Sequence, residues 1–285
     1  ERLPHLLVMT ATPIPRTLAL TVYGDLDVSL LDELPPGRIP PATRVYERAN
    51  REAALTQLER GLAAGGSAYV VCPAVGDSDE HDLVSAEGTF EELTRRFATK
   101  DIRVGLMHGQ LAPEERSEAM QRFASGETRV LVATTVIEVG VDVKSANVML
   151  VEGAERFGLA QLHQLRGRVG RAGQRSACLL VHRARSGDAH TRLDVLVETN
   201  DGFRIAEEDL RLRGPGELFG HRQSGLPGFR FGDLRRDLPL LERARACARA
   251  MLHADPELAR PEHASLREAA RKLRSAEVLV REEAG

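Results

Sequence analysis

The chain has 285 residues, of which 42% are hydrophobic and 28% charged, and its formal net charge is −3. This composition is ordinary for a globular protein, and the length predicts one large domain or two smaller ones. No apolar run is long enough to span a bilayer, which excludes a membrane-spanning helix. Cys72, Cys178 and Cys247 show no metal-ligand spacing. We expect Cys72 and Cys178 to be buried free thiols, which fits a reducing cytoplasm.

The first segment, residues 1–37, opens without a Met on an apolar run, and we interpret it as the end of a preceding domain in a longer protein. The stretch LPPGRIPP at residues 34–41 contains four prolines and therefore predicts a rigid linker. The pair Asp32-Glu33 runs into these prolines, so we assign it to the linker and not to a magnesium site.

Beyond the linker, runs rich in valine and leucine alternate with amphipathic segments. The runs predict buried parallel strands within residues 67–75, 102–109, 129–135, 147–153 and 177–183. The segments between them predict helices within residues 51–66, 112–127 and 159–167. This alternation is typical of a doubly wound, mostly parallel α/β sheet, whose ligands lie beyond the carboxyl ends of the strands. The acidic stretch from Asp77 to Ser85 predicts a surface loop.

After residue 185 the pattern becomes helical. A helix, a turn at NDG (residues 200–202) and a second helix that stops before Gly214 and Pro215 predict a helical hairpin, which a glycine-rich loop follows. The last 50 or so residues predict C-terminal helices with a turn near HADPELARPE. We therefore divide the chain into residues 1–37, 38–185, 186–233 and 234–285.

Polar residues follow the predicted strand within residues 129–135. Thr134 and Thr135 have hydroxyl groups at a strand end, where backbone N–H groups also point toward phosphate oxygens. Gly140 and Asp142 come shortly afterwards, and the Asp142 carboxylate suits a ribose hydroxyl. By itself this pattern is common and weakly specific.

The stretch QLHQLRGRVGRAGQR, residues 161–175, contains Arg166, Arg168, Arg171 and Arg175 and no acid. More widely, residues 155–192 hold eight arginines against two acids, a basic segment in a mildly acidic chain. Arg168 and Arg171 share one face of a helical turn, and their guanidinium groups suit phosphate oxygens. A solvated basic surface is the alternative.

Three stretches in this order resemble the third, fifth and sixth motifs of superfamily 2 helicases: TATPIPRT (10–17), ATTVIEVGVDV (133–143) and QLHQLRGRVGRAG (161–173). The longer stretch RFGLAQLHQLRGRVGR is similar both to the RecG family and to the transcription-repair coupling factors. The stretch DLRLRGPGELFGHRQSGLP (209–227), with Pro215, resembles the RecG form. Members of that family move on branched DNA.

The resemblance implies that residues 38–185 form the second RecA-like motor domain and residues 186–233 a translocation module. It implies a catalytic role for Gln164, Arg168 and Arg171, with the two arginines as a finger on ATP. It implies nucleotide binding by Gly140 and Asp142. It also implies DNA binding or coupling for Thr10, Thr12, His108, Gly109, Thr134, Thr135, Arg192 and Gln223.

The chain contains no phosphate-binding loop of the form G-x-x-x-x-G-K-[ST]. We therefore expect ATP and Mg²⁺ to be held mainly by a first motor domain upstream, and the isolated chain to be inactive. The resemblance implies branched double-stranded DNA as the partner, together with the protein's own N-terminal wedge and first motor domain. It also implies a monomeric, nucleoid-associated protein of the bacterial cytoplasm that binds no membrane. Two alternatives remain: a coupling-factor translocase and a non-enzymatic nucleic-acid-binding adapter.

Overall fold

The computed structural model describes residues 7, 9, 29, 37–73, 79–134, 143–171, 173–183, 187–213 and 237–272. It divides into two compact units, Glu1–Pro13 with Leu31–Leu212 and Ile14–Leu30 with Arg213–Gly285. The first unit contains the sheet and every described residue to which we assign a function.

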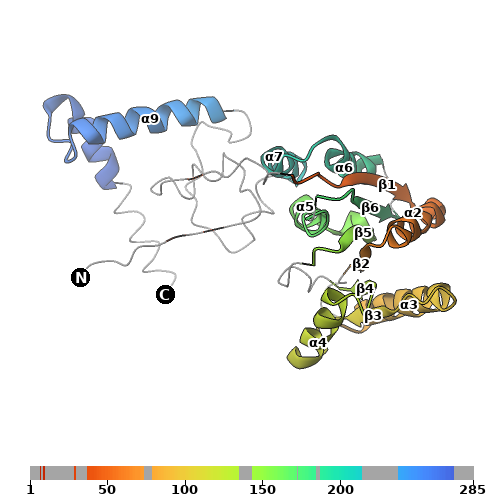
Figure 1. Ribbon diagram of the computed structural model, residues 1–285. Helices are drawn as coiled ribbons and strands as arrows, with labels where there is room; N and C mark the ends of the chain where they lie inside the picture. The colour runs from red at the N-terminus through yellow and green to blue at the C-terminus, as the bar shows by residue number, and fades with distance from the viewer. Residues whose placement is uncertain are drawn as a thin grey trace. The chain divides into compact units, whose positions relative to one another are not determined.

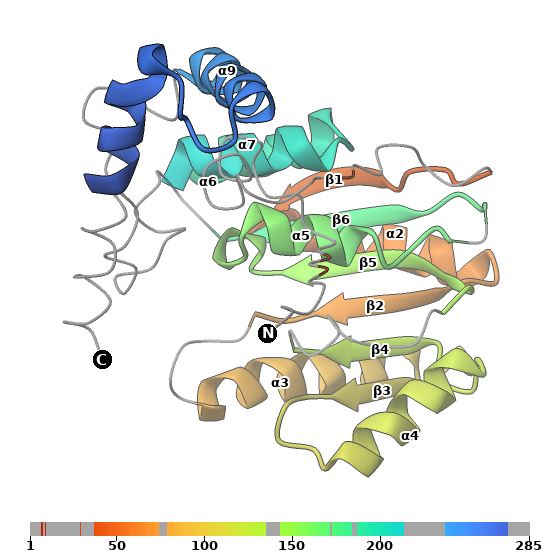
Figure 2. The same ribbon diagram turned by 90° about the vertical axis from the view of Figure 1, so that its left-hand side faces the viewer.

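The first unit is built on a six-stranded sheet in the order β1-β6-β5-β2-β4-β3, and all its strand pairs are parallel (Figure 2). The strands are β1 (Ala42–Glu47), β2 (Ser67–Val71), β3 (Val104–Met107), β4 (Val130–Ala133), β5 (Ala146–Glu152) and β6 (Ala177–His182). The predicted parallel α/β sheet and its five predicted strands are confirmed.

Strand β1 is a strand that the sequence analysis did not predict. It pairs along the whole length of β6 and lies at the edge of the sheet. Exposed and half-buried residues mix along it, with Val45 and Tyr46 as its large apolar residues. Such a half-exposed edge strand lacks the continuous apolar run that marked the buried strands.

Helices cover both faces of the sheet (Figure 1). Helices α2 (Arg51–Ala63) and α3 (Asp79–Phe97) lie on one face. The other face packs against α4 (Pro113–Ala124), α5 (Leu159–Arg166), α6 (Gly187–Glu198) and α7 (Gly202–Arg213). The predicted helices and the hairpin of α6 and α7 are confirmed. Asp201 begins α7, and its carboxylate accepts the N–H of Phe203 at 2.9 Å.

The core has two layers because successive strand residues point to opposite faces. In β4, Val130 and Val132 pack toward α2 and α3, whereas Leu131 and Ala133 pack toward the other helices. Both sets are fully buried, as a sheet covered on both faces requires. Cys72 and Cys178 lie in this core as free thiols, as predicted, and burial raises the pKa of Cys178 to about 12.

One expectation differs from the structure. The predicted loop from Asp77 to Ser85 is wrong from Asp79 onward, because α3 begins there. Acidic residues favour the first turn of a helix, where they interact with the positive end of the helix dipole, so the same composition fits a helix start. The compact unit that holds the sheet continues through Leu212, and our division after residue 185 stays a prediction. Helix α6 packs against β1, which explains this continuity.

The second unit contains α9 (Leu238–Ala254), the 3₁₀ turn Pro261–His263 and a helix at residues 264–272. The Asp255 carboxylate organises the turn between them. It accepts the N–H groups of Ala259 and Arg260, each at 2.9 Å, and lies 2.8 Å from the Nδ1 atom of His263. The backbone N–H of Arg260, followed by His263, lowers the pKa of Asp255 to about 2. Across the described ranges, no helix combines the length and apolarity needed to cross a membrane.

Candidate functional site

The carboxyl edge of the sheet brings together three of the residues that we predicted to contact DNA. Thr134 directly follows β4, and His108 and Gly109 follow the neighbouring strand β3. The Thr134 N–H donates to the carbonyl oxygen of Met107 at 3.2 Å, which continues the pairing of these strands to their ends. Thr134 is buried, whereas Gly109 lies exposed in a turn.

His108 has hydrogen-bonding capacity that the described part of the protein does not use. Its Nδ1 atom is buried and has no hydrogen-bond partner among the described residues. Its carbonyl oxygen accepts the N–H of Leu111 at 3.3 Å, so the backbone after β3 is held in a turn. An unpaired buried ring nitrogen carries an energetic cost, which a ligand or a water at this edge would relieve.

The arginine-bearing loop lies at the opposite, amino edge of the sheet. Helix α5 starts beyond the carboxyl end of β5 and runs back along the sheet, so its last residue, Arg166, lies toward the amino edge. The Gly170 N–H donates to the carbonyl oxygen of Ala146, the first residue of β5, at 3.1 Å. Our expectation that the ligand-binding residues gather beyond the carboxyl ends is therefore wrong for Arg168 and Arg171.

Glycines give the arginine-bearing loop its shape. Gly170 has φ +74°, which side-chain-bearing residues rarely adopt, and a Cβ atom there would lie 2.3 Å from the Ser176 hydroxyl oxygen, so Ser176 or the loop would have to shift. Arg168 is half-buried and Arg171 is exposed. The Arg171 Nε–H donates to the carbonyl oxygen of Gly167 at 3.3 Å. The half-buried Gln164 precedes them in the last turn of α5.

Arg166 has a different role from its neighbours. It is 3% exposed, and its guanidinium donates to the carbonyl oxygens of Leu196 at 2.7 Å and Thr199 at 3.0 Å. It also donates to His163 Nδ1 at 2.8 Å, because an arginine has no acceptor and the ring nitrogen must accept. Burial, followed by the charge of Arg166, lowers the pKa of His163 to about 4. Arg166 therefore joins α5 to the end of α6.

Arg192 ties the middle of α6 to the segment that precedes α5. It lies on α6, and its Nη2 atom donates to the carbonyl oxygens of Glu155 and of Phe157, the latter at 3.1 Å. These carbonyls belong to the segment that leads into α5. The hairpin is thus bonded both to the start and to the end of the helix that carries Gln164.

The other predicted residues lie outside the described part of the chain. They are Thr10, Thr12, Thr135, Gly140, Asp142 and Gln223. Conversely, the sequence analysis missed the contact of Arg38 with the arginine-bearing loop, where its Nη2 atom donates to the Gly167 carbonyl oxygen at 2.9 Å. The sequence signal was an arginine directly after a glycine in the proline-rich linker.

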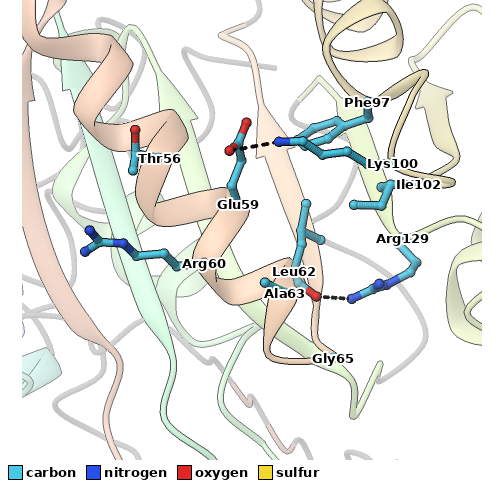
Figure 3. Close-up of a pocket in the computed structure, with 10 residues that line it drawn as sticks. All are labelled: Thr56, Glu59, Arg60, Leu62, Ala63, Gly65, Phe97, Lys100, Ile102 and Arg129. Carbon is cyan, nitrogen blue, oxygen red and sulfur yellow. Dashed lines mark hydrogen bonds and ion pairs between the residues drawn. The ribbon is translucent and has the colours of Figure 1, made fainter.

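A pocket of about 550 Å³ lies between α2 and the end of α3, away from all these residues (Figure 3). Three of its charged groups contact the protein itself: Lys100 pairs with Glu59 at 3.0 Å, and Arg129 donates to the Leu62 carbonyl oxygen at the end of α2. No predicted site residue lines this pocket. These contacts stabilise the junction of the two helices, and we assign the pocket a structural role.

Comparisons with known proteins give a consistent picture. A family model described as helicase conserved C-terminal domain matches residues 52–173. A second, described as ATP-dependent DNA helicase RecG, domain 3, C-terminal, matches residues 199–280. Proteins named ATP-dependent DNA helicase RecG are similar to the chain: that of Acidithiobacillus ferridurans is 52% identical over 256 residues, and that of Escherichia coli K12 is 47% identical over 259 residues.

Each of these two alignments covers 90% of this chain but 37% of the relative, so the chain spans little more than a third of their length. A solved structure described as RecG bound to a three-way DNA junction is 47% identical with a TM-score of 0.64, and the match covers 81% of this chain and 30% of that one.

Proposed function

We propose, from the premise that this chain belongs to the RecG family of helicases and matches their C-terminal portion, that it is the second motor lobe and translocation module of an ATP-dependent DNA translocase. The observation that carries the proposal is the separation of two polar edges on one sheet. Arg168 and Arg171 lie at the amino edge, whereas His108 and Thr134 lie at the carboxyl edge. One lobe can therefore contact a nucleotide and a nucleic acid at the same time without competition between them.

At the amino edge, Arg168 and Arg171 would contact the triphosphate of ATP. Their forked, permanently charged groups match phosphate oxygens, and an arginine at the γ-phosphate stabilises the charge of the transition state. Because the chain contains no phosphate-binding loop and spans 37% of its relatives, the groups that hold most of the nucleotide and Mg²⁺ would belong to another part of the full-length protein.

At the carboxyl edge, His108, Gly109 and Thr134 would contact the DNA backbone. Aromatic residues are 4% of the chain and tryptophan is absent, which disfavours base stacking and favours contacts to phosphates. Such contacts carry little sequence preference, which suits a motor that moves along any sequence. The relative bound to a three-way junction supports branched DNA as the substrate.

The two alternatives are less well supported. The RecG-type family model over residues 199–280 favours RecG over a coupling factor, because this region contains Pro215 and the RQSGLP loop. The arginine-bearing loop, whose glycines bring its backbone against the amino edge, disfavours an adapter, which needs no arginine pair.

The test is the Arg171→Ala substitution in the full-length protein. We expect DNA-stimulated ATP hydrolysis to fall by at least about 1,000-fold, the lower end of the contribution of an arginine finger, with DNA affinity within about threefold of the wild type. Hydrolysis is measured at saturating forked DNA and ATP. The matched control is Arg175→Ala, which removes an exposed arginine four residues away. Unchanged hydrolysis in Arg171→Ala would refute the finger.

A further inference from the structure

We propose that Arg38, in the linker that precedes the sheet, is a positioning residue for Arg171 and thereby sets the rate of ATP hydrolysis. The inference rests on the proposed function, because it assumes that Arg171 contacts the triphosphate. Within the chain it rests on one shared acceptor. The Gly167 carbonyl oxygen accepts both the Arg38 Nη2–H at 2.9 Å and the Arg171 Nε–H at 3.3 Å.

The shared carbonyl is a favourable place for two guanidinium groups. Gly167 caps the end of α5, and the last carbonyl oxygens of a helix are unpaired within the helix and carry its negative partial charge. A carbonyl oxygen has two lone pairs, so it can accept both N–H groups. Arg38 therefore donates to the same carbonyl oxygen that accepts from Arg171.

The rest of the linker follows the arginine-bearing loop closely. A Cβ atom on Gly173 would lie 3.0 Å from the Gly37 carbonyl oxygen, and one on Gly170 would lie 3.4 Å from the Ile39 carbonyl oxygen. Gly37 has φ +79°, a conformation that glycine adopts without strain. Residues 37–39 thus lie along the loop from Gly167 to Gly173.

This geometry makes the linker sensitive to the position of the loop. The proposed function places the rest of the nucleotide site in another part of the full-length protein. A change in the path of the linker at Arg38 would act, through the shared Gly167 carbonyl, on Arg171. A displacement of about 1 Å at a group that stabilises a transition state is enough to lower a rate about 100-fold.

The experiment uses the full-length protein with Arg38→Ala, Arg38→Lys and the control Arg44→Ala, which removes an exposed arginine from β1. We expect Arg38→Ala to lower kcat for DNA-stimulated ATP hydrolysis by about 10-fold or more, with KM for ATP within about twofold, because the loss acts on the transition state. Lysine retains a donor for the Gly167 carbonyl, so Arg38→Lys is expected to recover kcat to within about threefold of the wild type.

Two results would overturn the positioning role. The first is a kcat for Arg38→Ala within twofold of the Arg44→Ala control. The second is a loss of kcat that Arg38→Lys does not restore or that accompanies a lower unfolding temperature than that of Arg44→Ala. Arg171→Ala, assayed in parallel, separates the two proposals. If Arg171→Ala retains hydrolysis, the finger itself is refuted, whereas loss in Arg171→Ala with a normal Arg38→Ala refutes the role of Arg38 alone.

Discussion

Single arginines in one short stretch of this chain have different environments. Arg166 is buried and donates to two carbonyl oxygens and a histidine ring, whereas Arg171 is exposed at the amino edge of the sheet. Burial lowers the pKa of Arg166, yet its carbonyl partners keep the charged form hydrogen-bonded. A run of like charges can therefore combine a buried arginine that holds two helices together with an exposed arginine at the edge of the sheet.

His163, whose ring nitrogen accepts from Arg166, makes the stability of the protein depend on pH. The pKa of His163 is about 4 in the folded protein against an ordinary value of 6.5, so this contribution to stability is complete above pH 6.5 and is lost as the pH falls toward 4. Between these values the unfolded chain binds the proton and the folded one does not. In the wild type, the free energy of unfolding is therefore expected to fall as the pH is lowered from 6.5 to 4. We expect His163→Gln to reduce this fall by up to about 1.4 kcal/mol per pH unit, because glutamine accepts from Arg166 without titrating.

The measurement is urea unfolding at pH 7 and pH 5, followed by a probe that reports on the first unit. His253→Gln is the control, since His253 is exposed on α9 in the second unit. An equal loss of stability between pH 7 and pH 5 in wild type and His163→Gln would contradict the assignment.

At the scale of elements, α5 and α6 form a braced pair. Arg192 bonds the segment before α5 to the middle of α6, and Arg166 bonds the end of α5 to the last carbonyls of α6. Because the two helices are bonded at two separate places, they are expected to move as one body. This brace offers a physical route between the arginine-bearing loop and the helical hairpin.

For the brace we predict that Arg192→Ala separates hydrolysis from movement. In the full-length protein, unwinding of forked DNA is expected to fall about 10-fold or more, while ATP hydrolysis stays within about threefold, because the substitution leaves the arginine pair in place. Both rates are measured on the same fork. Arg204→Ala, at an exposed arginine of α7, is the control. Parallel loss of both activities would count against a coupling role.

At the scale of the whole molecule, the proposed nucleotide site would include residues outside this chain. The chain spans 37% of relatives that are about 50% identical to it, and it contains one side of the proposed site. An arginine pair without a phosphate-binding loop is not expected to hold ATP for hydrolysis.

We therefore predict that the isolated chain of 285 residues hydrolyses no ATP above background, with or without forked DNA, whereas the full-length protein does. Phosphate release at millimolar ATP is the measurement. ATP hydrolysis by the purified chain that disappears in its Arg171→Ala variant would contradict this prediction, because it would show that one lobe is enough for hydrolysis.

The sequence alone predicted most of the elements and showed the resemblance to the RecG family. Continuous apolar runs marked the strands from β2 to β6, helical periodicity marked α2, α4 and α5, and three helicase motifs in order indicated the RecG-like motor. These signals are local, because each depends on residues within one helix turn, one strand or one motif. They can therefore be recognised without knowing which distant residues pack against them.

The tertiary structure decided what depends on partners far away in the chain. It added β1, whose half-exposed edge position disguises its pattern, and it moved the start of α3 to Asp79. It placed Arg168 and Arg171 at the amino edge, since the helix that leads to them runs back along the sheet. Arg38 and Gly167 are 129 positions apart, and no local pattern predicts a contact across that separation, because packing of the whole sheet brings them together.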